Sequence, residues 1–178
     1  MNMVENFEDI EGLWYIENYL SQEESQEFYN YISNHVKLEP ISTAPSSRRV
    51  AHFGYYYSYK GTGLTPAPPI PDWLDDLLDI KLPMLEGKMD QIIINEYRPG
   101  QQIAYHTDHT GLFGPVIACI TVGHSVPIKF RCDGMVKQLD IKSGSMYVMT
   151  GKARYNWEHS LKNNSTETRY SITYRTIK

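Results

Sequence analysis

The second half of the chain alternates between apolar and polar residues in short runs, a pattern typical of β-strands. From residue 91 onward we expect eight strands, over residues 91–97, 103–107, 116–122, 126–131, 135–141, 145–149, 153–159 and 168–177. The dipeptide Asp133-Gly134, which lies between two of these runs, predicts a tight hairpin turn. A series of short strands separated by turn residues indicates a mainly β core.

The first 90 residues show helical periodicity at two places. Ser21-Gln22-Glu23-Glu24 has the form of a capping box, and Phe28, Ile32 and Val36 then fall on one stripe of the predicted helix. A second helix is predicted over residues 72–79, after a loop rich in Pro and Gly over residues 61–71.

Two helices followed by eight short strands predict a mainly β fold with flanking helices. The architecture expected is the double-stranded β-helix, or jelly roll, that is found in cupins. We expect a single domain over residues 1–178, with a helical part and a substrate lid in residues 1–90 and the jelly-roll core in residues 91–178.

Composition limits the class of protein. Residues 1–9 are acidic where a secretory signal would need a basic start, and no apolar run approaches membrane-spanning length. The two cysteines, Cys119 and Cys132, lack metal-ligand spacing, and the first is expected in the core. We therefore expect a reduced, intracellular protein of the cytoplasm or nucleus that is monomeric, not secreted and has no membrane partner.

The net charge of −4 argues against tight, non-specific binding to long nucleic acids, because such binding depends on Lys and Arg that neutralise phosphates. Local basic pairs remain as candidate contacts with a nucleic acid. They are Arg48 with Arg49, Lys129 with Arg131, and Lys152 with Arg154.

Two histidines and one carboxylate are the main candidates for chemistry. His106-Thr107-Asp108 is followed, after a stretch long enough for several strands, by His159. With six His and 21 acidic residues in the chain, a His-x-Asp match alone decides little. Two imidazoles and one carboxylate together suit a ferrous ion and leave positions open for oxygen and a co-substrate. We therefore take these three residues as candidate iron ligands.

The segment from Arg169 to Arg175 adds a candidate anion site. Its strict alternation places both arginines on one face of a strand and Tyr170, Ile172 and Tyr174 on the other. This pattern is expected where an anion binds inside a barrel, although an exposed strand with a polar outer face would show it too. Six residues of strand span roughly 20 Å, so the two arginines cannot hold one carboxylate together.

Taken in order, these motifs resemble the AlkB-like Fe(II)/2-oxoglutarate dioxygenases, which remove alkyl groups from, or hydroxylate, bases in DNA and RNA. The matching motifs are Asn95-Glu96-Tyr97-Arg98-Pro99-Gly100, His106-Thr107-Asp108, Trp157-Glu158-His159 and the segment from Arg169 to Arg175. Wider relatives such as prolyl hydroxylases share the His-x-Asp, the later His and one basic residue. The second arginine and the Asn-x-Tyr-x-Pro-Gly motif mark the AlkB-like pattern, and the similarity covers most of the chain from residue 12.

The resemblance implies a role for each matching residue, with Fe(II), 2-oxoglutarate and O2 as cofactor and co-substrates. The implied iron ligands, and so the catalytic residues, are His106, Asp108 and His159. The residues implied to bind 2-oxoglutarate are Asn95, Tyr97, Arg169, Ser171 and Arg175. Among these, Arg169 would hold the distal carboxylate and Arg175 would lie near the metal. Ser171 departs from the Asn that many members carry, but its hydroxyl can still donate to a carboxylate.

The segment from Arg48 to Tyr59 joins two arginines to a run of aromatic residues. A guanidinium can meet a phosphate and a ring can stack on a flipped or single-stranded base, although a strand with alternately packed tyrosines would look the same. The segment is similar to the AlkB-like substrate lid, in which an aromatic followed by Ser or His stacks on the target base. Tyr57-Ser58 holds that position here. We expect the substrate to contact Arg48, Arg49, Tyr57 and Ser58.

Within the family, residues 48–55, 112–117 and 149–155 look most like the branch that hydroxylates a modified wobble uridine in tRNA. A nucleic-acid substrate is therefore expected, with RNA slightly favoured over DNA. That branch elsewhere carries an RNA-binding domain and a methyltransferase, which this sequence does not show, so a protein partner for substrate recognition is also conceivable. Two alternatives stay open: an oxygenase that acts on a methylated protein side chain, and a non-catalytic nucleic-acid-binding member of the fold.

Overall fold

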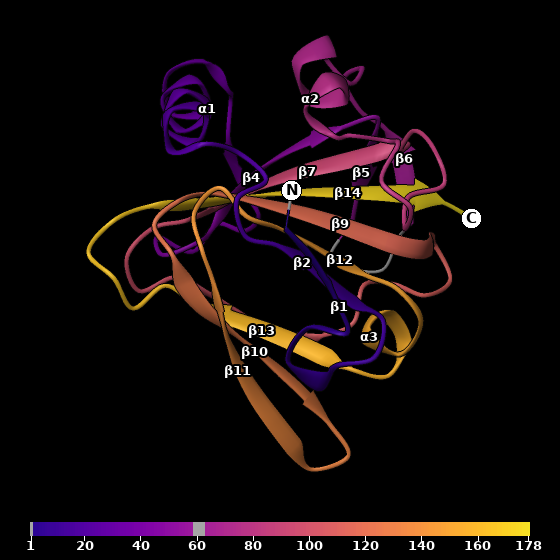
Figure 1. Cartoon of the computed structure of the whole chain (residues 1–178). Helices are drawn as coiled ribbons and strands as arrows, with labels where there is room; N and C mark the ends of the chain where they lie inside the picture. The colour runs from indigo at the N-terminus through magenta and orange to yellow at the C-terminus, as the bar shows by residue number, and fades with distance from the viewer. Residues whose placement is uncertain (1, 59–62) are drawn as a thin grey trace.

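Two antiparallel sheets make up the body of the protein in the computed structural model, which describes residues 2–58 and 63–178 (Figure 1). The larger sheet has eight strands, in the spatial order β1 (Met3–Glu5), β2 (Leu13–Ile16), β12 (Met146–Met149), β9 (Phe113–Gly123), β14 (Arg169–Ile177), β7 (Gln91–Tyr97), β4 (Arg49–Phe53) and β3 (Glu39–Pro40). The smaller sheet has four, in the order β11 (Met135–Ile141), β10 (Val126–Cys132), β13 (Glu158–Lys162) and β8 (Gln102–His106).

The remaining elements lie around these sheets. They are the hairpin of β5 (Tyr55–Tyr57) and β6 (Leu64–Pro66), the short helix η1 (Phe7–Asp9), and the helices α1 (Gln22–His35), α2 (Asp72–Leu77) and α3 (Gly151–Tyr155). Tyr59 of the expected lid and the first residues of the expected loop at 61–71 lie outside the described residues.

The layers are clearest in Figure 1, where α1 and α2 lie above the larger sheet and the smaller sheet lies below it. One apolar core fills the space between the helices and the larger sheet, with Ile32 of α1 and Leu74 of α2 packed near Ile120 and Ile172. A second core fills the space between the two sheets. Two facing antiparallel sheets confirm the predicted jelly roll.

The start of α1 follows the predicted capping box. The Ser21 hydroxyl accepts from the Glu24 backbone N–H at 3.0 Å, and the Glu24 carboxylate accepts from the Ser21 backbone N–H at 3.0 Å. Both interactions satisfy amides that have no partner inside the helix. Ile32, on the predicted apolar stripe, is fully buried.

Seven of the eight strands predicted after residue 91 are present within one to three residues of their expected ends, and the Asp133-Gly134 turn joins β10 to β11. Both turn residues have positive φ, 49° and 79°, as this two-residue hairpin requires. The prediction over residues 153–159 is wrong. Residues 151–155 form α3, and β13 begins only at Glu158, because tertiary hydrogen bonds of Arg154 hold this segment in a helical turn.

The first 90 residues also differ from the expectation of a helical region with a lid. They contribute β1 to β4 to the larger sheet, so this sheet is built from both halves of the chain. The expected loop at 61–71 includes β6, which pairs with β5, and the second helix ends at Leu77 rather than at residue 79.

Candidate active site

The smaller sheet brings the three candidate iron ligands together. β8 ends at His106, Asp108 follows two residues later, and β13 places His159 directly opposite His106. One potential ligand atom from each residue lies within 4.8 Å of the other two. The imidazole Nε2 atoms of His106 and His159 lie 3.6 and 3.8 Å from Asp108 Oδ1. Two imidazoles and one carboxylate around a common point fit the facial arrangement that non-haem Fe(II) takes.

The tautomer of His106 is suited to metal binding. Its Nδ1 lies 2.8 Å from the carbonyl oxygen of Ala104, an acceptor, so Nδ1 carries the proton. The lone pair on Nε2 is then directed to the position shared with Asp108. A backbone carbonyl that fixes the far nitrogen is the usual second contact of a metal-binding histidine.

Electrostatics keep the carboxylate charged and the buried imidazole neutral. Burial alone raises the pKa of Asp108, but Arg175, the two histidines and Arg154 outweigh it and lower this pKa to about 2. Burial, with His106 second, lowers the pKa of His159 to about 3. Near neutral pH these two residues therefore have the protonation states that a cation requires.

The inner face of β14 carries the predicted anion-binding residues. Tyr170, Ile172 and Tyr174 pack in the core beneath the helices, which confirms the predicted division of the two faces. At one end of the strand, Arg175 Nε lies 2.7 Å from Asp108 Oδ2. At the other end, Arg169 donates to the Thr121 hydroxyl at 2.8 Å. Arg175 thus lies at the metal end of the site and Arg169 lies at the opposite end of the strand, as their separation along β14 requires.

The surroundings of Arg169 show whether the site can bind a dicarboxylate. The residue is 0% exposed, and its Nε and Nη1 have no hydrogen-bond partner within residues 2–58 and 63–178. A buried guanidinium without a counter-ion is costly, and a carboxylate would satisfy it with two parallel hydrogen bonds. The residues present therefore fit the distal carboxylate of 2-oxoglutarate.

Strand register brings the other expected co-substrate residues to the same face. Asn95 lies opposite Ser171, and Tyr97 lies opposite Arg169. Asn95 and Ser171 line a pocket of about 290 Å³ together with the three iron ligands, Tyr97 and Arg175. Arg169 is not among the residues that line the pocket, but it interacts electrostatically with Cys119, Tyr147 and Tyr97, which do.

The two arginines of the expected lid point in opposite directions. Arg48 is 7% exposed, donates to Asn95 Oδ1 and lines the pocket, so its burial does not support a phosphate contact at an exposed rim. Arg49 makes two hydrogen bonds of 2.8 Å to the Glu96 carboxylate, on the face away from the pocket. Neighbouring residues of a strand face opposite sides, so both arginines cannot reach one ligand.

Of the other two expected substrate contacts, Tyr57 lines the pocket and Ser58 does not. Tyr57 of β5 lines the pocket, with its ring centroid 5.4 Å from that of Phe113 and 6.5 Å from that of His109. Ser58 lines a neighbouring groove, which Tyr57 borders as well.

Several residues that line the pocket were not among the predicted site residues, and three of them carry a polar group beside the predicted ones. Thr173 lies between Ser171 and Arg175 on the inner face of β14, the face on which the alternation of the strand predicts it, but no role in the site was predicted for it. Tyr147 and Cys119, which face each other across β12 and β9, also line the pocket. They occur in apolar runs that show no sequence signal beyond a buried strand.

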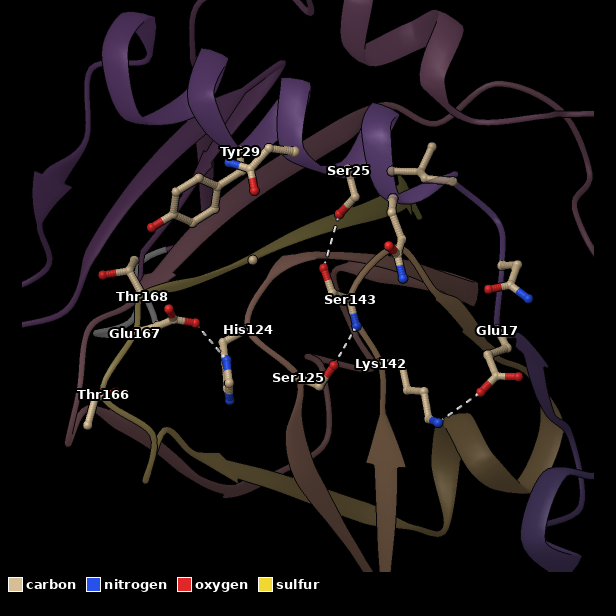
Figure 2. Close-up of a pocket in the computed structure, with 15 residues that line it drawn as sticks. Glu17, Ser25, Tyr29, His124, Ser125, Lys142, Ser143, Thr166, Glu167 and Thr168 are labelled. Atoms are coloured by element: carbon tan, nitrogen blue, oxygen red, sulfur yellow. Dashed lines mark hydrogen bonds and ion pairs between the residues drawn. The ribbon is translucent and has the colours of Figure 1, made fainter.

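A larger hollow of about 1020 Å³ lies at the other end of β14, around Gly123, which is paired with Arg169 (Figure 2). Its polar side chains bind one another. The pairs are His124–Glu167 at 2.9 Å, Ser25–Ser143 at 3.0 Å and Lys142–Glu17 at 3.3 Å. Among the described residues the metal-type cluster occurs at the smaller pocket, which is therefore the candidate active site.

The metal-free protein should become less stable as the pH falls from about 6.5 towards 4. Burial lowers the pKa of His52 to about 4 and that of His159 to about 3, from an ordinary value of 6.5. Between these values the unfolded chain binds protons that the folded protein does not, so acid favours unfolding. Urea unfolding at a series of pH values checks this, and His52→Gln should flatten part of the dependence. A free energy of unfolding that does not change over this range would contradict the assignment.

The comparison with known families decides the class. Residues 12–175 match the family model described as the 2OG-Fe(II) oxygenase superfamily. The chain belongs to this superfamily. It is therefore an iron- and 2-oxoglutarate-dependent dioxygenase, and the His106, Asp108 and His159 cluster is where its Fe(II) fits.

Curated relatives place the oxygenase among AlkB-like enzymes. It is 30% identical over 159 residues to tRNA (carboxymethyluridine(34)-5-O)-methyltransferase ALKBH8 of Macaca fascicularis, covering 84% of this chain and 24% of that protein. It is 23% identical over 210 residues to the DNA oxidative demethylase ALKBH2 of Arabidopsis thaliana, covering 93% of this chain and 66% of that protein. The oxygenase thus spans about a quarter of the length of the first relative.

Solved structures agree on the fold. The structure of OsALKBH1 has a TM-score of 0.68 at 10% identity and covers 93% of this chain and 96% of that one. At such low identity the similarity establishes the jelly-roll fold of the oxygenase. Among the described residues, no helix is long and apolar enough to cross a membrane.

Proposed function

We propose that this oxygenase demethylates or hydroxylates a modified nucleobase in RNA or single-stranded DNA. The observation that carries the proposal is the position of Tyr57, whose ring lines the same pocket as the three iron ligands. An aromatic ring beside a reaction centre suits an unpaired or flipped base, which stacks on it while its substituent reaches the metal. The names of the two curated relatives, one acting on tRNA and one on DNA, support the same class of substrate.

Bound Fe(II), with 2-oxoglutarate and O2, would supply oxidation of a C–H bond coupled to decarboxylation of the co-substrate to succinate. The protein's own residues bind and orient. Arg169 holds the distal carboxylate, Arg175 orients the Asp108 carboxylate, and Ile117, Met149 and Leu161 supply apolar walls that limit water. Hydroxylation of an N-methyl group would release formaldehyde, whereas a carbon-linked substituent would keep its hydroxyl.

RNA is the favoured polymer, because the relative with the higher identity acts on tRNA. We further propose a single-domain, monomeric, intracellular protein, in keeping with its two free cysteines, and a protein partner that aids recognition of the substrate.

A product screen tests the proposal. The purified protein would be loaded with Fe(II) and 2-oxoglutarate and offered modified nucleosides in tRNA, mRNA and single-stranded DNA, with a methylated peptide in parallel. Mass spectrometry should detect loss of a methyl group or gain of oxygen on a nucleoside, together with succinate. Turnover of the peptide with none on any nucleoside would favour a protein substrate. Binding of RNA without succinate formation would favour a non-catalytic role.

Tyr57→Ala should lower activity on a modified oligonucleotide by roughly five- to 150-fold, because stacking of a base on an aromatic ring contributes about 1–3 kcal/mol. Tyr57 lies on β5 and is not a candidate metal ligand, so 2-oxoglutarate turnover without substrate should hardly change. Tyr55→Ala is the matched control, since Tyr55 is on the same strand but is exposed and does not line the pocket. Equal losses in both variants would argue against stacking by Tyr57.

A further inference from the structure

We infer that Arg154 is a positioning residue for the metal site, which sets the location of Asp108 relative to His159. It lies on α3, whereas Asp108 lies on the loop between β8 and β9. His159 follows Arg154 by five residues, on the strand that α3 leads into. Arg154 therefore joins the two segments that supply these ligands.

The contacts of Arg154 span the whole loop that carries Asp108. Its Nη1 donates to the Asp108 carbonyl at 2.7 Å, and its Nε donates to the Gly114 carbonyl at 3.1 Å. Its Nη2 lies 3.4 Å from the carbonyl oxygens of His109 and Phe113. One side chain thus bonds the loop at Asp108 and the first residues of β9, at Phe113 and Gly114.

The guanidinium of Arg154 is buried, and its hydrogen bonds to backbone carbonyls are what offset the loss of its hydration. Arg154 is 2% exposed, and within the described residues it forms no ion pair with a carboxylate. Burial lowers its pKa, while Asp108 raises it. Removing a guanidinium from water costs free energy that the carbonyl contacts offset, and without the guanidinium the Asp108 and Gly114 carbonyls would lose this donor. The conformations of the loop and of Arg154 therefore depend on each other.

The helix that carries Arg154 is itself anchored. The Thr150 N–H and hydroxyl donate to the Gly12 carbonyl at 2.9 and 2.8 Å, and the Ala153 N–H donates to the Glu11 carbonyl at 2.9 Å. These bonds fix α3 on the segment that enters β2. The guanidinium consequently extends from a fixed support, which allows it to define where the loop lies.

Arg154 and Arg175 act on different parts of the same ligand. Arg175 pairs with the Asp108 carboxylate at 2.7 Å and so orients the side chain. Arg154 bonds the Asp108 carbonyl and so places the backbone. Loss of Arg154 should therefore alter the spacing of the ligands while leaving all three in the protein.

Metal affinity tests the inference, with Co(II) as a spectroscopic substitute for Fe(II). Arg154→Met keeps an unbranched side chain but has no donors. It should raise the Co(II) dissociation constant by roughly 10- to 100-fold, the usual effect of losing a group that orients a metal ligand. The ligand-field spectrum of the Co(II)-loaded variant should also change. Arg154→Lys, which can still donate to a carbonyl, should recover part of the affinity.

Lys152→Ala is the matched control, since Lys152 lies on the same helix and pairs with Glu11 at the surface. Its Co(II) affinity and spectrum should match those of the unaltered protein. A folded Arg154→Met variant with unchanged affinity and spectrum would overturn the inference.

A second measurement needs no variant and so covers the case in which Arg154→Met fails to fold. Co(II) should slow amide exchange in the unaltered protein both in residues 108–114 and in residues 151–157, because Arg154 couples the two segments. Protection confined to the loop would show that α3 does not respond to the metal, and the inference would fail.

Discussion

Asp108→Ala should abolish 2-oxoglutarate turnover. The carboxylate is one of the three candidate ligands, and the Arg175 guanidinium beside it favours its ionised form. Two histidines alone leave the iron without its anionic ligand and without one of its three attachments to the protein. Succinate formation with Fe(II) and oxygen present is the measurement, and it should fall to the level of a reaction without enzyme.

The fold should persist in this variant, as circular dichroism would show, although the loss leaves Arg175 without its carboxylate. Asp108→Asn serves as the shape-matched comparison. It keeps the volume and removes the charge, and it should also lose turnover if the charge on the ligand is what matters. Conversion of 2-oxoglutarate by Asp108→Ala at the normal rate would show that the assigned ligands are wrong.

Arg169→Ala should weaken 2-oxoglutarate binding by about 30-fold to several thousandfold, because truncating one partner of a buried charged pair costs roughly 2–5 kcal/mol. The reason lies in the structure: Arg169 is fully buried, and two of its nitrogens have no partner among the described residues. Calorimetric titration of the Co(II)-loaded protein with 2-oxoglutarate measures the effect. Unchanged affinity would mean that the distal carboxylate is bound elsewhere.

Two other arginines separate this effect from a general loss of charge. Arg49→Ala should leave 2-oxoglutarate affinity unchanged, since Arg49 pairs with Glu96 on the opposite face of the larger sheet. Arg175→Ala should reduce turnover as well as binding, because Arg175 lies 2.7 Å from the Asp108 carboxylate.

Much of the site followed from local pattern. Side chains of a strand alternate, so the spacing of Arg169, Ser171 and Arg175 was enough to place them on one face, and the structure confirms it. The same rule, applied to Arg48 and Arg49, would have shown that only one of them can face the pocket. The chemistry of two imidazoles and a carboxylate likewise indicated iron before any geometry was known.

Segments whose conformation depends on distant contacts were not predictable in this way. The residues 153–159 have the composition of a strand, but Arg154 bonds carbonyls 40 and 46 positions away, and the segment begins as a helix. Local propensity is a weak guide where such contacts compete with it.

By itself, the sequence determined the mainly β fold, the candidate ligand types and the face of β14 that carries Arg169 and Arg175, because each depends on residue identity and on periods of a few residues. The tertiary structure alone decided that His106 and His159 lie opposite each other, that Arg169 is buried with two nitrogens unsatisfied, and that Arg154 holds the loop of Asp108. Each of these features depends on contacts between segments that are far apart in the chain. They arise only when the two sheets pack, since no local pattern records which groups become neighbours.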